Sequence, residues 1–146
     1  MKRLLIMSCS SVKKADEGVM PALERYDGPS YRVVRAHKAQ GRRLPRVLIL
    51  SSLYGLIEAK HPIRTYDQKL DDKTASVLIR SRADRQMLVS AVNAADDIFV
   101  HAGGLYLDVL TSWGGSADGG VPAWRVAAGA PGQRLAGLKE WLGRVG

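Results

Sequence analysis

The chain has 146 residues, of which 46% are hydrophobic, 25% charged and only 6% aromatic, so it is long enough for one domain with an aliphatic core and is neither disordered nor fibrous. Lys and Arg number 22 against 14 Asp and Glu, which gives a formal net charge of +8 and favours partners that carry phosphate groups. A single cysteine excludes an internal disulfide framework and a four-thiolate zinc site.

Short apolar runs predict buried strands at residues 4–7, 47–51 and 98–101, because strands covered on both faces of a parallel sheet are continuously apolar. A weaker candidate covers residues 121–127, where Pro122 favours an edge strand. The first run is too short for the apolar region of a signal peptide and is interrupted by Ser8. The sequence has no run of about 18 apolar residues, so we expect a cytoplasmic protein without a membrane span.

Helical spacing of apolar residues predicts helices at residues 30–40, 74–95 and 133–142, and one that begins near Leu105. Strands that alternate with helices imply parallel pairing and right-handed crossovers. We therefore expect a single α/β domain over residues 1–146, a three-layer α/β/α sandwich with a small, mostly parallel four-stranded sheet. The Gly-rich segment at residues 114–120 is interpreted as a flexible loop.

Ligands of such sheets bind beyond the carboxyl ends of the strands, and the residues that follow the first strand are small and polar. Ser8, Ser10 and Ser11 would let backbone N–H groups approach a ligand, and Lys13 would supply a charge for phosphate or carboxylate. The P-loop pattern is absent from this segment. Cys9 is a candidate nucleophile near lysines or, alternatively, a small buried residue. The whole segment could also be an ordinary polar loop.

The second strand is followed by residues that could cradle a ring and its polar groups. They are Ser51, Ser52, Tyr54 and Gly55, with Tyr66 and Asp67 further along the chain. The Asp67 carboxylate could stabilise an oxocarbenium-like transition state or activate water, as in the cleavage of N-glycosidic bonds. Alternatively, Tyr66 and Asp67 only end a loop and bond to the backbone.

The third strand is followed by Gly103, Gly104 and Tyr106. Paired glycines before a helix permit close approach of the backbone and direct N–H groups toward an anion. His101, at the end of this strand, is either a structural histidine or an acid or base. The three histidines of the chain lack metal-like spacing, so we predict no metal site and no cofactor.

Basic residues are concentrated in two short stretches of the chain. They are Arg32, Arg35, His37, Lys38, Arg42, Arg43 and Arg46 in the first stretch, and Arg80, Arg82 and Arg85 in the second. Such runs fit contact with DNA or RNA through a basic surface, but they are also typical of a solvated helix face.

Six segments together resemble a known family. They are SCSSVKK (8–14), RYDGPSY (25–31), LSSLYGLI (50–57), PIRTYDQKL (62–70), HAGGLY (101–106) and GAPGQRLAGLKEWL (129–142). Across nearly the whole chain they resemble the small bacterial and phage α/β domains related to YaaA, the peroxide-stress protein family. The opening Cys-Ser segment with its lysines is also similar to a motif of archaeosine synthase, where a lysine attacks a modified base, and Lys13 or Lys14 would correspond. The resemblance implies a link to DNA binding, protection from oxidative damage or base modification.

Three functions remain as hypotheses. The first is an enzyme that cleaves or exchanges an N-glycosidic bond of a nucleotide or nucleobase, with Asp67, Lys13 and Cys9 as catalytic candidates and Tyr54 and Tyr66 beside the base. The second is a non-catalytic DNA- or RNA-binding module that contacts phosphates through the basic surface. The third is an accessory subunit that docks through residues 114–120 and Trp113 or Trp124. The sequence leaves the oligomeric state open.

Overall fold

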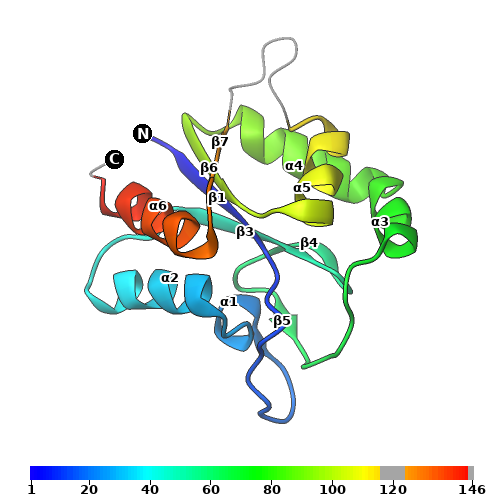
Figure 1. Cartoon of the computed structure of the whole chain (residues 1–146), viewed down its shortest axis with the longest axis horizontal. Coiled ribbons are helices and arrows are strands. Elements are labelled where there is room, and N and C mark those ends of the chain that lie inside the picture. Colours follow the sequence, from blue (N-terminus) through cyan, green and yellow to red (C-terminus); the bar gives the residue numbers. More distant parts are fainter. Residues whose placement is uncertain (116–123, 145–146) are drawn as a thin grey trace.

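The computed structural model describes residues 1–115 and 124–144 (Figure 1). The elements follow one another as a mixture of short strands and helices. In chain order they are β1 (Arg3–Ser8), β2 (Met20–Pro21), α1 (Ala22–Arg25), α2 (Pro29–Ala39), β3 (Arg46–Ser51), β4 (Gly55–Glu58), β5 (Pro62–Ile63), α3 (Asp72–Ile79), α4 (Arg82–Asn93), β6 (Asp97–His101), α5 (Gly104–Leu110), a π-helical turn (Thr111–Gly115), β7 (Arg125–Val126) and α6 (Pro131–Gly143).

The main sheet is mostly parallel and has the strand order β4-β3-β1-β6-β7. Strand β1 pairs in parallel with β3 and β6, so that Leu5 lies opposite both Val47 and Phe99. Strand β7 extends the sheet in parallel beside β6, and β4 is antiparallel to β3. A separate antiparallel pair is formed by β2 and β5. The chain therefore has an α/β fold.

The predicted number of four strands is wrong, because β4 adds a fifth strand to the main sheet. The segment after β3 was expected only to cradle a ligand, whereas Gly55 at φ +76° lets the chain reverse and pair with Ser51. A Cβ at Gly55 would lie 2.4 Å from Asp84 Oδ2, and the same oxygen accepts a bond from the Leu56 N–H at 3.3 Å. Glycine is therefore required at this turn on two grounds.

The three buried strands predicted from apolar runs are confirmed by β1, β3 and β6, with ends that differ by at most one residue. The weak edge candidate at 121–127 corresponds to β7, which covers only Arg125–Val126 and pairs with β6 alone. Residues 121–123 of that prediction, Pro122 included, lie outside the described residues. Most of the expected glycine-rich loop at 114–120 lies outside them as well.

The single helix predicted at 74–95 is wrong, since two helices occupy this segment. Asp71 caps the first by accepting a bond from the Thr74 N–H at 2.7 Å. Ser81 starts the second by accepting a bond from the Asp84 N–H at 3.3 Å, an interaction that favours a new helix start over continuation. The other predicted helices correspond to α2, α5 and α6. Within the described ranges, no helix is long and apolar enough to cross a membrane.

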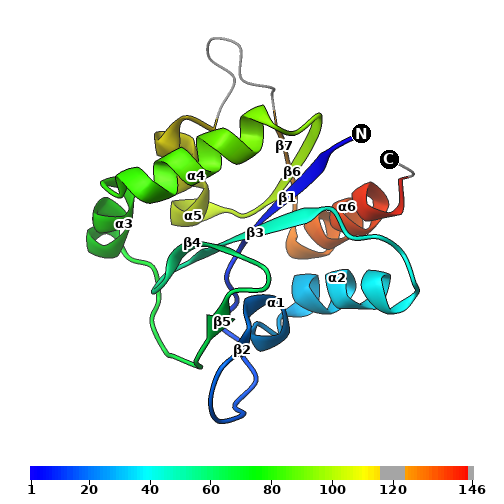
Figure 2. The same ribbon diagram turned by 180° about the vertical axis from the view of Figure 1, so that it is seen from behind.

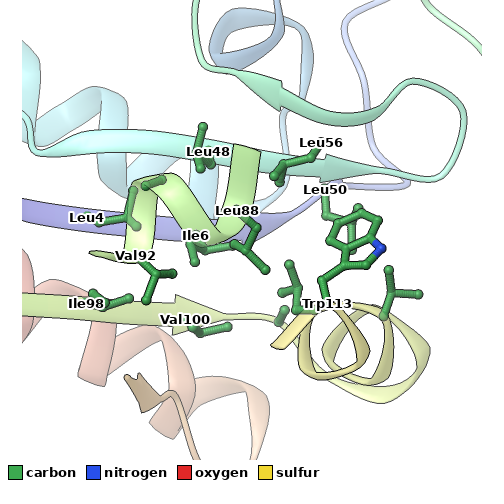
Figure 3. Packing of buried hydrophobic residues seen from close by; sticks show 14 of the residues in the cluster. Leu4, Ile6, Leu48, Leu50, Leu56, Leu88, Val92, Ile98, Val100 and Trp113 are labelled. Carbon is green, nitrogen blue, oxygen red and sulfur yellow. The ribbon is translucent and has the colours of Figure 1, made fainter. Parts of the chain in front are cut away.

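Helices lie on both faces of the sheet: α3, α4 and α5 on one side, and α1, α2 and α6 on the other (Figures 1 and 2). Strand β1 contributes to both cores, with Leu4 and Ile6 in one and Leu5 and Met7 in the other. Figure 3 shows the first core, in which Trp113 packs beside the sheet.

Trp113 is fully buried, and its indole N–H donates to the Ile79 carbonyl at 3.2 Å. The suggestion that Trp113 is an exposed docking residue is therefore wrong, because the indole fills the core between the helical turn after α5 and the end of α3. Trp124 is half-buried and packs against the same core.

Asp97 at the start of β6 joins several elements at the amino end of the sheet. Its carboxylate accepts bonds from Arg125 at 2.9 Å and from the Trp141 indole at 3.1 Å, and forms an ion pair with Arg3 at 3.5 Å. Burial alone would raise the pKa of Asp97, but these hydrogen bonds and positive charges outweigh burial and lower the pKa. Asp97 is thus an ionised anchor of this end.

Candidate functional site

The segments that follow β1, β3 and β6 meet at one edge of the sheet. Cys9, just after β1, has its Sγ 3.2 Å from the Tyr106 hydroxyl in α5 and 3.9 Å from the Ser52 hydroxyl after β3. The Cys9 N–H also donates to the Leu50 carbonyl at 2.9 Å, which continues the β1–β3 ladder. The thiol of Cys9 therefore lies where the three segments meet.

A hydrogen-bonded group of hydroxyls lies directly beside this thiol. The Tyr66 hydroxyl is 2.6 Å from the Tyr26 hydroxyl and 2.8 Å from Ser51 Oγ. Ser51 Oγ also accepts bonds from the backbone N–H groups of Leu53 and Tyr54, at 3.2 and 3.0 Å. Ser51 is completely buried, and its hydroxyl holds the turn and orients the two phenols. Tyr26 is also fully buried, so the phenol of Tyr66 is the more accessible of the two.

Ser52, the second serine of the predicted pair, joins the turn to the loop that carries Tyr66. Its hydroxyl donates to the Gln68 carbonyl at 2.7 Å, and the Gln68 side-chain amide donates to the Ser52 carbonyl at 2.8 Å. Ser52 is 2% exposed. This reciprocal pair fixes the loop over the serines.

The two adjacent lysines point to different surroundings. Lys13 Nζ lies 4.3 Å from the centre of the Tyr66 ring and 5.8 Å from that of Tyr26, which is the geometry of a cation–π contact. Lys14 instead lies 3.9 Å from the Glu24 carboxylate. Of the two lysines, only Lys13 contacts the tyrosines of this hydroxyl cluster.

Tyr26, Tyr66 and Tyr106 are neutral phenols at physiological pH, because the pKa of each is raised. Burial is the largest cause that raises the pKa of Tyr26, Tyr66 and Tyr106, because the charged phenolate is poorly solvated there. The hydrogen bond to Cys9 raises the pKa of Tyr106 further. Each phenol can therefore both donate and accept a hydrogen bond.

Tyr54 and Asp67, both predicted site residues in the segments after β3, are exposed. The Tyr54 ring packs edge-on against Tyr66 at a centroid distance of 5.6 Å and is 36% exposed, and its hydroxyl accepts a bond from the Arg64 N–H at 3.4 Å. The Asp67 side chain is exposed and has no hydrogen bond or ion pair within the described residues. Tyr54 is thus an exposed ring joined to the phenol of Tyr66, and Asp67 is an exposed carboxylate one residue after Tyr66.

The three predicted serines after β1 have different environments. Half-buried Ser8 offers its carbonyl to the Tyr31 hydroxyl at 2.7 Å. Ser10 Oγ accepts a bond from the Val12 N–H at 3.2 Å, and Ser11 is exposed. Ser8 thus anchors the strand end, while Ser10 and Ser11 shape the loop that leads to Lys13.

Gly103 and Gly104 separate β6 from α5. A Cβ on Gly103 would lie 2.3 Å from Arg134 Nη2, so the absence of a side chain allows the guanidinium of α6 to lie against this backbone. Gly104 begins α5 at φ +54°. Burial lowers the pKa of His101, and the charge of Arg134 lowers it further. His101 is therefore a neutral imidazole. It lies near the guanidinium of Arg134, a residue that the sequence did not single out.

Arg25 is a further residue that the sequence analysis missed. It is fully buried, and its guanidinium donates to the carbonyls of Lys14 at 2.7 Å, Asp16 at 2.9 Å and Gly18 at 2.8 Å. These bonds hold the loop that carries Lys13. The segment RYDGPSY supplied a signal, since it contains both Arg25 and Tyr26, but no role could be assigned to either residue from spacing.

The described part of the chain contains no group of three or more His, Cys, Asp and Glu side chains arranged to hold a metal ion. Residues 4–140 match a protein family described as "Family of unknown function (DUF6884)". No curated protein matches the sequence.

Proposed function

The chain belongs to the DUF6884 family of unknown function, and we propose that it binds a nucleotide or nucleobase at the carboxyl ends of β1, β3 and β6 and cleaves or exchanges its N-glycosidic bond. The observation that carries this proposal is the position of Cys9, whose thiol contacts Tyr106 and Ser52 from the other two segments. In parallel sheets, this end of the strands is where ligands bind.

The residues of the site offer separate contacts for the parts of a nucleotide. The Lys13 ammonium, which lies over the Tyr66 ring and donates to the Ser11 carbonyl at 3.5 Å, supplies a positive charge for phosphate. The exposed ring of Tyr54 offers an aromatic surface on which a base can stack. The phenol of Tyr66 lies between them and can donate a hydrogen bond to the sugar or the base.

The proposed reaction uses the carboxylate of Asp67. As the bond between the sugar carbon and the base nitrogen breaks, both electrons leave with the base, and positive charge develops on the sugar. The Asp67 carboxylate stabilises this charge. In hydrolysis, water supplies the new oxygen on the sugar carbon and a proton for the departing base, whereas in exchange an incoming base takes the place of water. Cys9 is the alternative nucleophile. The variant Cys9→Ser separates the two mechanisms, because it should retain base release if Asp67 acts and lose it if the thiol attacks the sugar carbon.

Binding is tested by calorimetry with a panel of nucleoside mono- and triphosphates and modified nucleotides, using the two neighbouring lysines as a matched pair. Lys13→Met should weaken the affinity about tenfold or more, since a charge-assisted contact contributes about 1.5–3 kcal/mol. Lys14→Met, which removes a lysine paired with Glu24, should change the affinity less than about twofold. Equal effects of the two substitutions would contradict the proposed phosphate contact.

Catalysis is tested by chromatography of free base after incubation with the same panel. Asp67→Asn should abolish base release and leave the affinity nearly unchanged, whereas Asp72→Asn, a matched exposed carboxylate in α3, should retain activity. Absence of base release from every substrate, or full activity of Asp67→Asn, would refute the proposed chemistry.

A further inference from the structure

A concave feature lies at the end of the sheet opposite to Cys9, where β1 and β3 begin. It is a hollow of about 880 Å³ between the start of β1, the segment from α2 to β3, and the ends of α4 and α6. Figures 1 and 2 show the start of β1 and the end of α6 at this same end of the molecule. Leu4, the last residue of β1 that lines the hollow, precedes Cys9 by five residues, or about 16 Å along the strand, and the two sites share no residues.

The lining of the hollow is strongly basic and contains no Asp or Glu among the described residues. Its cationic side chains come from both ends of the chain as well as its middle. They are Lys2, Arg3, Arg42, Arg43, Arg46 and Arg144. Three separate segments thus place positive charge around one concavity.

Some of these cations are already neutralised. Arg3 lies over the Trp141 ring at 3.9 Å and forms an ion pair with Asp97 at 3.5 Å. Arg46 pairs with Glu58 at 2.5 Å, and Arg144 with Glu140 at 3.1 Å. These three arginines build the wall of the hollow and leave little charge for a ligand.

The remaining three cations, Lys2, Arg42 and Arg43, have no ion pair and no side-chain hydrogen bond within the described residues. An adjoining smaller hollow of about 460 Å³ shares Arg42 and adds Lys139, which is likewise without an ion pair there. Uncompensated charges repel one another, and an anion between them would remove this repulsion.

His37 lines both hollows and lies near their cations. Burial lowers the pKa of His37, and the charges of Arg42 and Arg3 lower it further. Arg42, one of the unpaired cations, is therefore close enough to His37 to act on it.

We propose that this hollow is a second binding site, specific for a compact anion with two or more linked phosphate groups. Its volume matches the range of about 300–1,000 Å³ that is typical of small-ligand pockets, and exceeds what one phosphate needs. Arginine guanidinium groups bind phosphate oxygens in pairs. The cations surround a concavity instead of following one helix, which favours a compact oligophosphate over an extended nucleic-acid backbone. The ligand class is independent of the nucleotide proposed for the other end.

The test compares orthophosphate, pyrophosphate, tripolyphosphate, a short DNA single strand and the matching duplex by calorimetry at one ionic strength. Tripolyphosphate should bind at least about tenfold more tightly than orthophosphate. In two-dimensional NMR spectra it should shift the amide signals of residues 2–4, 42–44 and 46. Absent binding, affinity that does not rise with the number of linked phosphates, or tighter binding of either DNA than of tripolyphosphate would each overturn the proposal.

Substitutions that remove equal charge separate a site from a general effect of net charge. Arg42→Gln with Arg43→Gln should weaken tripolyphosphate binding about tenfold or more, because both guanidinium groups are exposed at the hollow. Arg82→Gln with Arg85→Gln, on the exposed surface of α4, removes the same charge and should change the affinity less than about twofold. Equal loss in the two double variants would overturn the proposal. Lys13→Met should leave tripolyphosphate binding unchanged, which distinguishes this site from the nucleotide site.

Discussion

Replacing Arg25 by methionine removes the one buried guanidinium that holds the loop carrying Lys13. Arg25 is 0% exposed and donates to three backbone carbonyls at 2.7–2.9 Å and to a fourth, that of Ile63, at 3.4 Å. Methionine fills much of the same space but donates no hydrogen bond. The three short bonds are the main loss, and each leaves a carbonyl without its donor.

A hydrogen bond contributes about 1 kcal/mol net, so loss of three bonds should lower the free energy of unfolding by about 3 kcal/mol. Urea unfolding followed by circular dichroism measures this change as a lower midpoint at constant slope. The matched control is Arg32→Met. Its side chain is 67% exposed and pairs with Asp27 on the surface, so the expected change is below about 0.5 kcal/mol. A free energy of unfolding for Arg25→Met within about 0.5 kcal/mol of wild type would refute the role of these bonds.

Three further substitutions test the fold by the same unfolding measurement. Gly55→Ala should lower the free energy of unfolding by about 2–3 kcal/mol, because it combines a positive φ with a steric clash. The control Gly41→Ala, at φ +78° in open space, should lower it by about 1 kcal/mol. Equal losses in the two variants would exclude a contribution from the clash. Trp113→Ala should cost about 3–5 kcal/mol, and a smaller loss would mean that this indole is not buried. Asp97 has a lowered pKa, so its stabilisation is complete above its unfolded pKa of about 3.9 and is lost as the pH falls through the folded value. In the Asp97→Asn variant, the free energy of unfolding should therefore fall less toward acid pH than in the wild type. An unchanged pH profile would contradict this assignment.

The strands could be predicted because their apolar runs are continuous, as in residues 4–7 of β1, where alternate side chains enter opposite cores. The break between α3 and α4 was missed although residues 80–86 interrupt the apolar pattern, because the cap at Ser81, with Asp84 three residues later, was not recognised as a helix start. Strand β4 was missed because Gly55 and its neighbours have the composition of a turn. The spacing of apolar residues identifies the buried face of a helix or strand, but it does not show where a helix is capped or where the chain reverses direction.

The meeting of Cys9, Ser52 and Tyr106 was accessible from the sequence, because parallel strands place the segments at their carboxyl ends along one edge. Tyr26 was missed, since it follows a short helix outside the strand pattern and reaches the site only through tertiary packing. The basic hollow was missed for a related reason. Its uncompensated cations at Lys2 and at 42–43 are far apart in the sequence, and only the fold brings them to one concavity.

The central claim is that the segments after β1, β3 and β6 form one ligand site. NMR titration of the isotope-labelled chain with the tightest-binding nucleotide tests it most directly. Amide signals from residues 8–14, 51–56 and 102–106 should shift together and fit a single dissociation constant, and Lys13→Met should weaken that constant about tenfold. Shifts confined to one of the three segments, or located only at residues 2–4, 42–44 and 46, would contradict the claim.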